Sequence, residues 1–317
     1  MDKRISLIMG YPACGKTTQA KQYESQGYHR LNRDELGGSL DKLVAEMDKL
    51  YVSQEITQFI LDNTYPTKQS REGVIRWAKE QGFEVECNWI DADIGDALFN
   101  ASQRIIRKYR KLLMPEEIKV QKDPSVYPPV AIYRSRKIFE PPSKEEGFRE
   151  VNKIPFIRTI DTQKYSNRAY IFDYDGTLRT TISGEKYPLS KNDIQIFPER
   201  ASILQELYAE GNLILGVSNM SVISSGKISM EHAIECYEYT NELLDVPIDY
   251  AFCPHPAFPQ VCYCRKPIPG LGVAFIEKYK LDPSKCIMVG DLKTDKTFAQ
   301  RCGFQFQDVE QFFMSHI

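Results

Sequence analysis

The sequence predicts an α/β protein of two domains, each a mainly parallel sheet with helices on both faces. Short apolar runs that fit buried strands alternate with segments that fit helices, which is the order a parallel sheet requires. The length of 317 residues is enough for two separate cores. We expect the boundary within residues 160–167, which gives domains of residues 1–160 and 161–317.

The first domain begins with an apolar strand at residues 5–9, which enters a glycine-rich turn and is followed by a helix at residues 17–25. The alternation then continues, and glycine at position 82 ends one of the helices. The further elements predicted here are a strand at 58–61, a helix at 68–81, a strand at 84–90 and a helix at 94–110.

The second domain repeats the pattern from about residue 165 onward. Its strands are short and apolar, and Gly211 stops one of its helices. The elements predicted here are a strand at 169–172, a helix at 198–210, strands at 213–217 and 287–289, and a helix at 294–302.

The composition is that of a globular protein outside the membrane, with 42% hydrophobic and 26% charged residues. A net charge of −2 excludes a wholly basic protein that coats nucleic acid, but it leaves room for a local basic groove. The early apolar run at residues 5–9 is too short for a signal peptide or a membrane span. The spacing of the eight cysteines is not that of a small secreted scaffold. We therefore expect a cytoplasmic protein with no membrane partner.

Residues 10–17 fit the phosphate-binding pattern G-x-x-x-x-G-K-[ST] between a predicted strand and a predicted helix. In such a loop the backbone N–H groups surround phosphate oxygens, the lysine reaches the β and γ phosphates, and the threonine binds Mg²⁺. The alternative is a chance match in an ordinary turn. At the helix start we also expect a lowered pKa for the thiol of Cys14. The candidate ATP-binding residues are Gly10, Cys14, Gly15, Lys16, Thr17 and Thr18.

Two carboxylates follow strands predicted at the same sheet edge, where ligands collect in open α/β folds. Asp34 follows a short strand and is our candidate base for an attacking hydroxyl, although a helix N-cap is the alternative role. Asp62 ends the next predicted strand. With Arg33 and Arg71 it forms the set of candidate substrate-binding residues in this domain.

Basic residues dominate the segment from Arg104 to Glu140, which is a candidate path for a phosphodiester backbone. Arg104, Arg107 and Arg110 are spaced so that all three can lean toward one side of a helix. We choose Arg107 as the arginine that stabilises charge on a transferring phosphoryl group. A solvated basic face is the alternative for each of them.

The motif D-Y-D-G-T-L at residues 173–178 resembles the first motif of the haloacid dehalogenase superfamily. Asp173 is the expected nucleophile, and Asp175 is the expected acid and base. Ser218 and Asn219 follow a later strand and can hydrogen-bond phosphoryl oxygens, while Lys266 can neutralise the phosphate. Magnesium takes oxygen ligands. The candidate Mg²⁺ ligands of this domain are Asp173, Asp175, Asp291 and Asp295, and in the first domain Thr17.

Three cysteines and one histidine lie in two tight pairs within residues 253–264. Three thiolates and one imidazole can hold one tetrahedral Zn²⁺ with no open position, which indicates a structural role. The arrangement resembles the zinc loop of histidinol and heptose-bisphosphate phosphatases. The alternatives are buried free thiols or a disulfide. The candidate zinc ligands are Cys253, His255, Cys262 and Cys264.

Several segments resemble bifunctional polynucleotide 5′-kinase/3′-phosphatases, across most of residues 1–158 and again in the second domain. They are residues 32–37, 62–64, 139–148 and 180–188. The resemblance implies a P-loop kinase fold followed by a haloacid-dehalogenase-like phosphatase fold. It also implies that Asp34 activates a 5′-hydroxyl and that Asp62 helps to hold the acceptor end. Tyr65 departs from the family, which often has a second asparagine there.

The function expected from the sequence is the healing of RNA or DNA strand ends. The enzyme would phosphorylate 5′-hydroxyls with ATP and remove 3′-phosphates through an aspartyl-phosphate, with Mg²⁺ in both domains and a structural Zn²⁺. The products suit a nucleic-acid ligase, which is a candidate partner. One alternative is a small-molecule kinase fused to a sugar- or histidinol-phosphate-type phosphatase. Another is that one of the domains is a binding module without catalysis.

Overall fold

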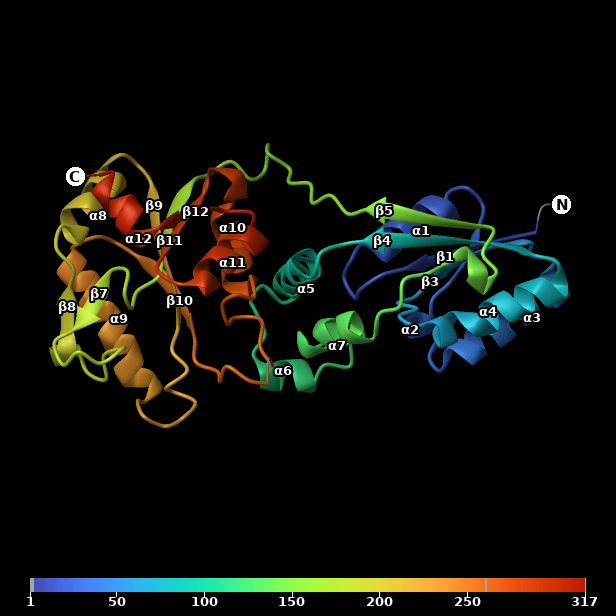
Figure 1. Cartoon of the computed structure of the whole chain (residues 1–317), viewed down its shortest axis with the longest axis horizontal. Coiled ribbons are helices and arrows are strands. Elements are labelled where there is room, and N and C mark those ends of the chain that lie inside the picture. The colour runs from blue at the N-terminus through green and yellow to red at the C-terminus, as the bar shows by residue number, and fades with distance from the viewer. Residues whose placement is uncertain (1–2, 260, 317) are drawn as a thin grey trace. The chain divides into compact units, whose positions relative to one another are not determined.

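The computed structural model describes residues 3–259 and 261–316, and it confirms the predicted fold class. The chain divides into two compact units. The first contains the residues up to Asn100 and Lys122–Arg158, and the second contains Ala101–Gln121 and the residues from Thr159 onward. Each unit has its own five-stranded sheet, in which all neighbouring strands are parallel (Figure 1).

The first sheet places the strand at the beginning of the chain in its centre. Because β1 pairs with both β3 and β4 in parallel, the carboxyl ends of these strands lie at the same edge. The order across the sheet is β2 (His29–Leu31), β3 (Gln58–Asp62), β1 (Arg4–Met9), β4 (Glu84–Asp91) and β5 (Glu150–Pro155).

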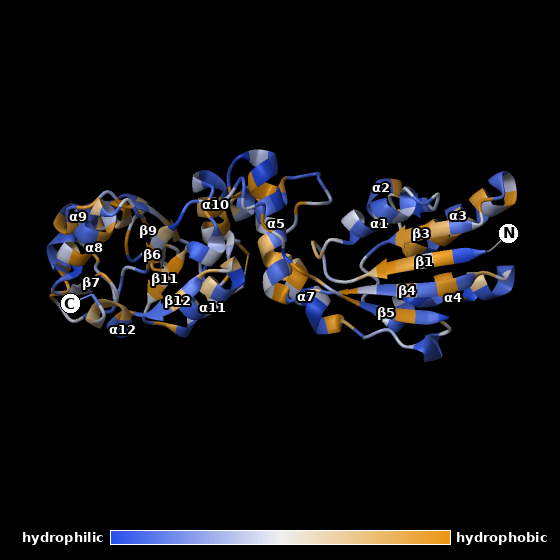
Figure 2. Cartoon of the chain, turned by 90° about the horizontal axis from the view of Figure 1, so that it is seen from above, coloured by the Kyte–Doolittle hydropathy of each residue, from blue (hydrophilic) through white to orange (hydrophobic). Residues whose placement is uncertain are grey.

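Helices cover both faces of this sheet because the side chains of β1 alternate between the two faces. Ile5, Leu7 and Met9 share a core with α3 (Leu40–Gln54) and α4 (Lys68–Gln81). Ile8 packs instead in a cluster with Ala20 of helix α1, which spans Lys16–Glu24. In Figure 2 the carboxyl-terminal part of β1 is coloured as hydrophobic, as a strand buried on both faces requires.

The second sheet has the strand that precedes Asp173 in its centre. Strand β6 pairs in parallel with β9 on one side and with β11 on the other. The order is β10 (Asp249–Cys253), β9 (Leu213–Asn219), β6 (Ala169–Phe172), β11 (Ile287–Gly290) and β12 (Gln305–Asp308). A separate antiparallel pair is formed by β7 (Arg179–Thr181) and β8 (Ile194–Ile196).

Aromatic rings fill one face of this second sheet. Phe172 contacts Phe312 and Phe313, whose ring centroids lie 5.6 and 6.1 Å from its own. Tyr174 packs edge-on against Tyr237 at 4.7 Å. The helices that contribute to this core are α8 (Arg200–Ala209), α9 (Met230–Leu244) and α12 (Val309–Met314).

Most predicted elements are present with small shifts at their ends, and the helix predicted at residues 68–81 matches α4. Thr67 caps that helix, and Gly82 ends it in the left-handed conformation with φ 72°. Within the described residues, no helix is long and apolar enough to cross a membrane. The remaining helices are α2 (Arg33–Leu36), α5 (Ile94–Tyr109), α6 (Pro115–Lys119), α7 (Val130–Ile138), α10 (Gly270–Tyr279) and α11 (Lys293–Cys302).

Candidate active sites

The loop after β1 has the tight backbone that its two outer glycines allow. Gly10 and Gly15 have φ values of 145° and 94°, which residues other than glycine rarely adopt. A Cβ atom at Gly10 would lie 2.7 Å from Cys14 Sγ and 2.9 Å from the carbonyl oxygen of Ile90. The loop therefore closes tightly on itself before α1 begins at Lys16.

The beginning of α1 is open to an anion. The N-cap residue is Gly15, which has no side chain to accept the first N–H groups of the helix. Thr18 is exposed in the first turn, and its backbone N–H donates to the Gly15 carbonyl. Unsatisfied N–H groups at a helix start favour negatively charged ligands.

Lys16 and Thr17 both make contacts that place them at this sheet edge. The buried Lys16 ammonium donates to the carbonyl oxygens of Tyr11 at 2.7 Å and Gly10 at 3.2 Å. The Thr17 hydroxyl donates to Asp62 Oδ2 at 2.9 Å. A hydroxyl and a carboxylate at this distance could share one Mg²⁺, since that ion takes oxygen ligands.

Cys14 is buried beside Lys16, and the lowered pKa expected for its thiol is wrong. Burial raises the pKa of Cys14, and the nearby Lys16 ammonium opposes this rise only in part. The thiol is therefore not a reactive thiolate in this structure. Its backbone position in the loop remains that of a predicted phosphate-binding residue.

Arg30 is a site residue that the sequence analysis missed. Its Nη2 donates to Asp62 Oδ2 at 2.9 Å, so the buried Asp62 carboxylate serves both Arg30 and Thr17. The sequence signal for this role was weak, because Arg30 lies in a strand of only three residues, which strand propensity alone could not locate. Asp62 is thus engaged with the loop and with β2, and its contact with an acceptor end stays a prediction.

Asp34 is free to act as a base because another residue caps the helix that contains it. The Asn32 side chain accepts the backbone N–H groups of Asp34 at 2.8 Å and Glu35 at 3.2 Å, so Asn32 is the cap. The side chain of Asp34 is 49% exposed and pairs with Arg33 at 3.0 Å. A half-exposed carboxylate at this sheet edge can reach an incoming hydroxyl.

Arg71 has a structural role, which replaces the substrate-binding role proposed from the sequence. Its side chain is fully buried and forms a two-point ion pair with Glu146 at 2.7 and 2.9 Å. The remaining nitrogen donates to the carbonyl oxygens of Tyr65 and Glu140. The guanidinium thus joins three chain segments and has no exposed surface for a substrate.

Arg107 lies in the second unit, where it contacts a glutamate of α10. Its guanidinium donates to Glu277 Oε1 at 2.9–3.0 Å and to the Tyr165 hydroxyl at 3.0 Å. Burial would raise the pKa of Glu277, but its hydrogen bonds with Arg107, Tyr165 and Gln103 outweigh burial and lower it. These contacts stabilise the unit, and the predicted role of Arg107 in phosphoryl transfer stays a prediction.

Arg136 is a second arginine that the sequence analysis did not single out. It lies on α7 in the first unit, and α7 ends beside Phe139, whose ring contacts Tyr11 of the loop at 5.6 Å. Burial raises the pKa of Tyr11, and the Arg136 guanidinium is near enough to oppose that rise. An exposed cation close to the loop could meet a bound phosphate.

In the second unit, Asp173 follows β6 and lies within a buried ion cluster. Lys266 Nζ contacts Asp173 Oδ1 at 2.7 Å, Asp295 Oδ1 at 2.8 Å and the Val217 carbonyl at 2.9 Å. Burial raises the pKa of Asp173 to about 7, which Lys266 opposes and Asp295 reinforces. Burial acts to lower the pKa of Lys266, but both carboxylates outweigh it and raise it. The cation therefore stays charged between them.

Three carboxylates of this cluster could hold a metal ion together. Single oxygens of Asp173, Asp291 and Asp295 lie within 4.8 Å of one another. Glycines permit this approach: a Cβ atom would lie 2.7 Å from Asp291 if placed at Gly176, and 2.7 Å from Asp295 if placed at Gly290. An all-oxygen set of this kind suits Mg²⁺.

Asp175 is not part of that group, and its role as a metal ligand stays a prediction. Its Oδ1 accepts from Arg179 Nε at 2.8 Å. The physical reason is the turn itself, which brings Arg179 beside Asp175. Its predicted acid and base role does not need metal contact.

Ser218 and Asn219 end β9, next to Asp173's strand. Ser218 is buried, and its predicted contact with phosphoryl oxygens stays a prediction. Asn219 exchanges two hydrogen bonds of 3.0 Å with the backbone of Lys266, which use its amide oxygen and one of its two amide hydrogens. Asn219 thus holds the Lys266 segment in place, and its contact with a substrate stays a prediction.

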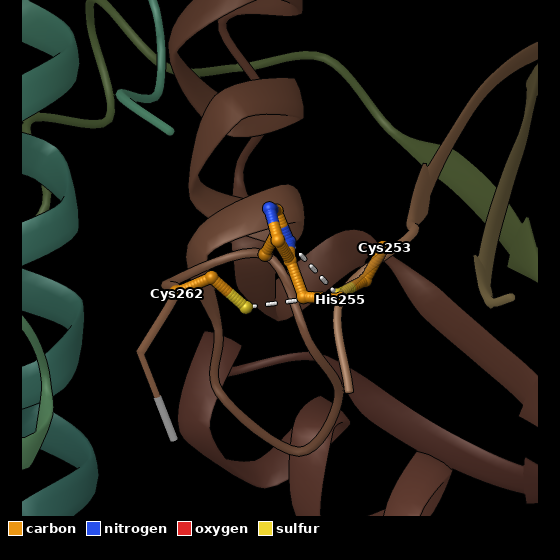
Figure 3. Close-up of side chains that lie close together, drawn as sticks. Cys253, His255 and Cys262 are labelled. Atoms are coloured by element: carbon orange, nitrogen blue, oxygen red, sulfur yellow. Dashed lines mark hydrogen bonds between the residues drawn. The ribbon is translucent and has the colours of Figure 1, made fainter. Parts of the chain in front are cut away.

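The predicted zinc ligands are brought together at the end of β10. Figure 3 shows Cys253, His255 and Cys262 pointing toward one another. His255 Nδ1 lies 3.5 Å from Cys253 Sγ and 3.2 Å from Cys264 Sγ, and the four ligand atoms lie within 4.8 Å. The three cysteines are free thiols, and together with His255 they could hold one metal ion. Because Lys266 follows two residues after Cys264, this group bears directly on the lysine's position.

We expect the Arg71–Glu146 pair to be essential to the stability of the first unit. Replacing Arg71 by Met leaves the buried Glu146 carboxylate without its cation, and breaking such a pair costs about 3–5 kcal/mol. The measurement is urea unfolding of Arg71→Met, with Arg76→Met as control because Arg76 pairs with Glu72 on the surface. Equal stabilities of the two variants would contradict the structural role of Arg71.

Removing Arg107 should destabilise the second unit in a pH-dependent way. The pKa of folded Glu277 is below its ordinary value of 4.5. The pairing of Glu277 with Arg107 therefore adds its full contribution to the free energy of unfolding above pH 4.5, and this contribution is lost as pH falls through the lowered pKa. At neutral pH the free energy of unfolding of Arg107→Met should therefore be about 1–3 kcal/mol lower than that of the wild type, and this difference should shrink in acid. Urea unfolding across pH measures this, and a constant gap would contradict it.

Comparison with known proteins gives matches to phosphatases. A family model described as "Polynucleotide kinase 3 phosphatase" matches residues 168–313. A "Bifunctional polynucleotide phosphatase/kinase" of Schizosaccharomyces pombe is 29% identical over 155 residues, which is 49% of this chain and 34% of that protein. The match thus spans about a third of the length of that relative.

Two further matches are a second protein of known sequence and a solved structure. A "Probable D-glycero-D-manno-heptose-1,7-bisphosphate 7-phosphatase" of Thermoplasma volcanium is 30% identical over 145 residues, covering 44% of this chain and 97% of that protein. A solved chain from a Pnkp1/Rnl/Hen1 complex is 15% identical, covers 97% of this chain and 96% of its own length, and has a TM-score of 0.35.

Proposed function

Because this chain belongs to the haloacid dehalogenase phosphatases and resembles bifunctional polynucleotide kinase/phosphatases, we propose that it heals broken nucleic-acid strands. It phosphorylates 5′-hydroxyl ends with ATP and removes 3′-phosphates. The observation that carries this proposal is the presence of two complete sets of phosphate-handling residues in one chain. One set gathers around the loop at residues 10–17, and the other gathers around Asp173.

The phosphatase step uses Asp173 as nucleophile. Its carboxylate oxygen bonds to the phosphorus of a 3′-phosphate while the ester P–O bond breaks, and protonated Asp175 gives its proton to the leaving 3′-oxygen. Water then attacks the aspartyl-phosphate and gives a proton to Asp175, which frees Asp173 and inorganic phosphate. Lys266, 2.7 Å from Asp173, holds the nucleophile and offsets the phosphoryl charge.

The kinase step uses Asp34 as base. It accepts the proton of the 5′-hydroxyl while that oxygen attacks the γ-phosphorus of ATP, and the bond to the β-phosphate oxygen breaks to release ADP. The loop at residues 10–17 holds the phosphates, and Lys16, which contacts the carbonyl oxygens of this loop, supplies positive charge to them. Arg107 is the arginine proposed for the phosphoryl group, and Arg136 beside Tyr11 is a second candidate.

The donor sets fit Mg²⁺ in both sites. Thr17 with Asp62, and Asp173 with Asp291 and Asp295, offer closely spaced oxygen atoms. When bound, Mg²⁺ supplies positive charge that offsets the negative charge of the phosphoryl oxygens. The Cys₃His group fits a structural Zn²⁺, because its four protein ligands leave no open position.

The substrate and partners follow from this chemistry. Exposed basic residues of α7, among them Arg134 and Arg136, support contacts with the phosphates of an RNA or DNA strand. A 5′-phosphate and a 3′-hydroxyl are the ends that a ligase joins, so a nucleic-acid ligase is the proposed partner. Such an enzyme works inside the cell, in the cytoplasm.

A second candidate is a small-molecule kinase joined to a sugar-phosphate phosphatase. It is favoured by the match that covers 97% of the heptose-bisphosphate phosphatase of Thermoplasma volcanium. A phosphatase for small sugars should prefer heptose bisphosphate to an oligonucleotide 3′-phosphate, and this preference separates the two functions.

The proposal requires two independent sites. Lys16→Ala should lower 5′-phosphorylation of an oligonucleotide roughly 100-fold or more and leave 3′-dephosphorylation unchanged, because a positioned charge is lost at one site only. Asp173→Ala should do the reverse. Lys21→Ala, an exposed lysine of the same helix, is the control. If either variant lost both activities, the two-site account would be wrong.

The zinc assignment predicts a metal that can be counted. Purified protein should contain about one Zn²⁺ per chain by plasma mass spectrometry, since Cys₃His sites bind this ion. Cys264→Ser should lose the Zn²⁺. Its 3′-phosphatase activity should fall more than its 5′-kinase activity, because Lys266 follows two residues later. Cys286→Ser, a buried cysteine outside the group, should keep the metal. Zinc-free wild-type protein with full activity would overturn the assignment.

A further inference from the structure

Arg179 is a fully buried arginine at the edge of the phosphatase site, and the mechanism above gives it no role. Its side chain has no exposed surface. Nε donates to Asp175 Oδ1 at 2.8 Å, and this is the ion pair of Arg179. Burying a charged group is costly unless it is paired, so Asp175 is the charge that makes this position tolerable.

One terminal nitrogen of the guanidinium, Nη1, is held by α9, while Nη2 is buried without a hydrogen-bond partner among the described residues. Nη1 donates to the Cys236 carbonyl at 2.9 Å and to the Thr240 hydroxyl at 2.8 Å. The guanidinium carbon lies 4.6 Å from the centre of the Tyr237 ring and 5.3 Å from that of Tyr174. These contacts fix the plane of the guanidinium, and the direction of its Nε–H is therefore fixed as well.

The short turn of residues 173–179 sets the distance between the two charged groups. Backbone hydrogen bonds from Arg179 N to the Tyr174 carbonyl and from Gly176 N to the Arg179 carbonyl close the turn. They bring Asp175 and Arg179 into a bridge-like pair four residues apart. Packing against α9 thus fixes Arg179, and Arg179 in turn fixes the direction of the Asp175 carboxyl.

The neighbouring aspartates therefore differ in their contacts. Asp173, Asp291 and Asp295 gather their oxygens within 4.8 Å, while Asp175 is drawn out of this set toward Arg179. Its side chain keeps 18% exposure, so it remains open to an incoming ester. A carboxyl kept off the metal-competent group is available for proton transfer to the leaving oxygen.

We propose that Arg179 is the positioning residue for Asp175, holding this acid and base group toward the leaving oxygen and away from the metal-competent aspartates. The inference rests on the proposed phosphatase function and deepens it. Arg179 itself touches neither the phosphoryl group nor the nucleophile, and it acts only through Asp175.

The test compares two leaving groups in single-turnover experiments with excess enzyme, which isolate formation of the aspartyl-phosphate. An oligonucleotide 3′-phosphate releases an alcohol and needs a proton from Asp175. The aryl ester p-nitrophenyl phosphate releases a stabilised phenolate and needs none. Arg179→Met should slow the oligonucleotide roughly 100-fold, the low end of what general acid catalysis contributes, and the aryl ester at most a few-fold.

Three further variants make the outcome decisive. Arg179→Lys keeps the charge and should recover part of the oligonucleotide rate. Thr240→Val removes one anchor of Arg179 without touching Asp175, and it should show the same leaving-group preference more weakly. Arg200→Met is the control, because Arg200 donates to the Thr177 carbonyl of the same turn and does not contact Asp175. Its ratio of the two rates should equal that of the wild type.

The possible results separate the inference from the proposed function. A selective loss on the oligonucleotide supports positioning. Equal losses on both esters in Arg179→Met, or an unchanged ratio in Thr240→Val if Arg179→Met does not fold, would overturn it. A wild-type protein that hydrolyses neither ester would instead overturn the proposed phosphatase function.

Discussion

Both sites depend on one constraint, which is that carboxylates gathered at the carboxyl edge of a parallel sheet need cations beside them. Parallel pairing sends the ends of β6 and β11 to the same edge, where Asp173 and Asp291 become neighbours, and it brings Asp62 at the end of β3 beside the loop that follows β1. In the second unit the Lys266 ammonium lies between Asp173 and Asp295 at 2.7 and 2.8 Å. In the first unit Arg30 pairs with Asp62. Without these cations the buried carboxylates would have to take up protons or move apart.

Residues next to the reacting groups divide into those that hold charge and those that hold position. Lys266 does both, because Asn219 ties its backbone through two hydrogen bonds of 3.0 Å. The Cys₃His group closes the loop just before it. Arg179 pairs with the carboxyl of Asp175, and the neutral Asn32 caps the turn that carries Asp34. Catalysis needs groups held to within a fraction of an ångström, which explains this second layer of contacts.

The sequence was enough for the fold class and for the residues at strand ends, because apolar runs and motif spacing are local signals. Asp173 and Asp291, which follow β6 and β11, lie close to Asp295 and Lys266. The sequence could not assign Arg71, since its partner Glu146 lies 75 residues away, and it missed helices such as α3 and α9. It also gave no sign that Arg179 hydrogen-bonds the carboxylate of Asp175, because motif spacing does not reveal this contact.

The most direct test of end healing uses short RNA and DNA strands that carry a 5′-hydroxyl and a 3′-phosphate, incubated with enzyme and Mg²⁺ and analysed by tandem mass spectrometry. Without ATP, each accepted strand should lose one phosphate from its 3′ end. With ATP it should return to its starting mass, with fragment ions that place the phosphate at the 5′ end. Comparison of the two sugars gives the preferred nucleic acid in the same run. Strands unchanged at both ends, with or without ATP, would contradict the account.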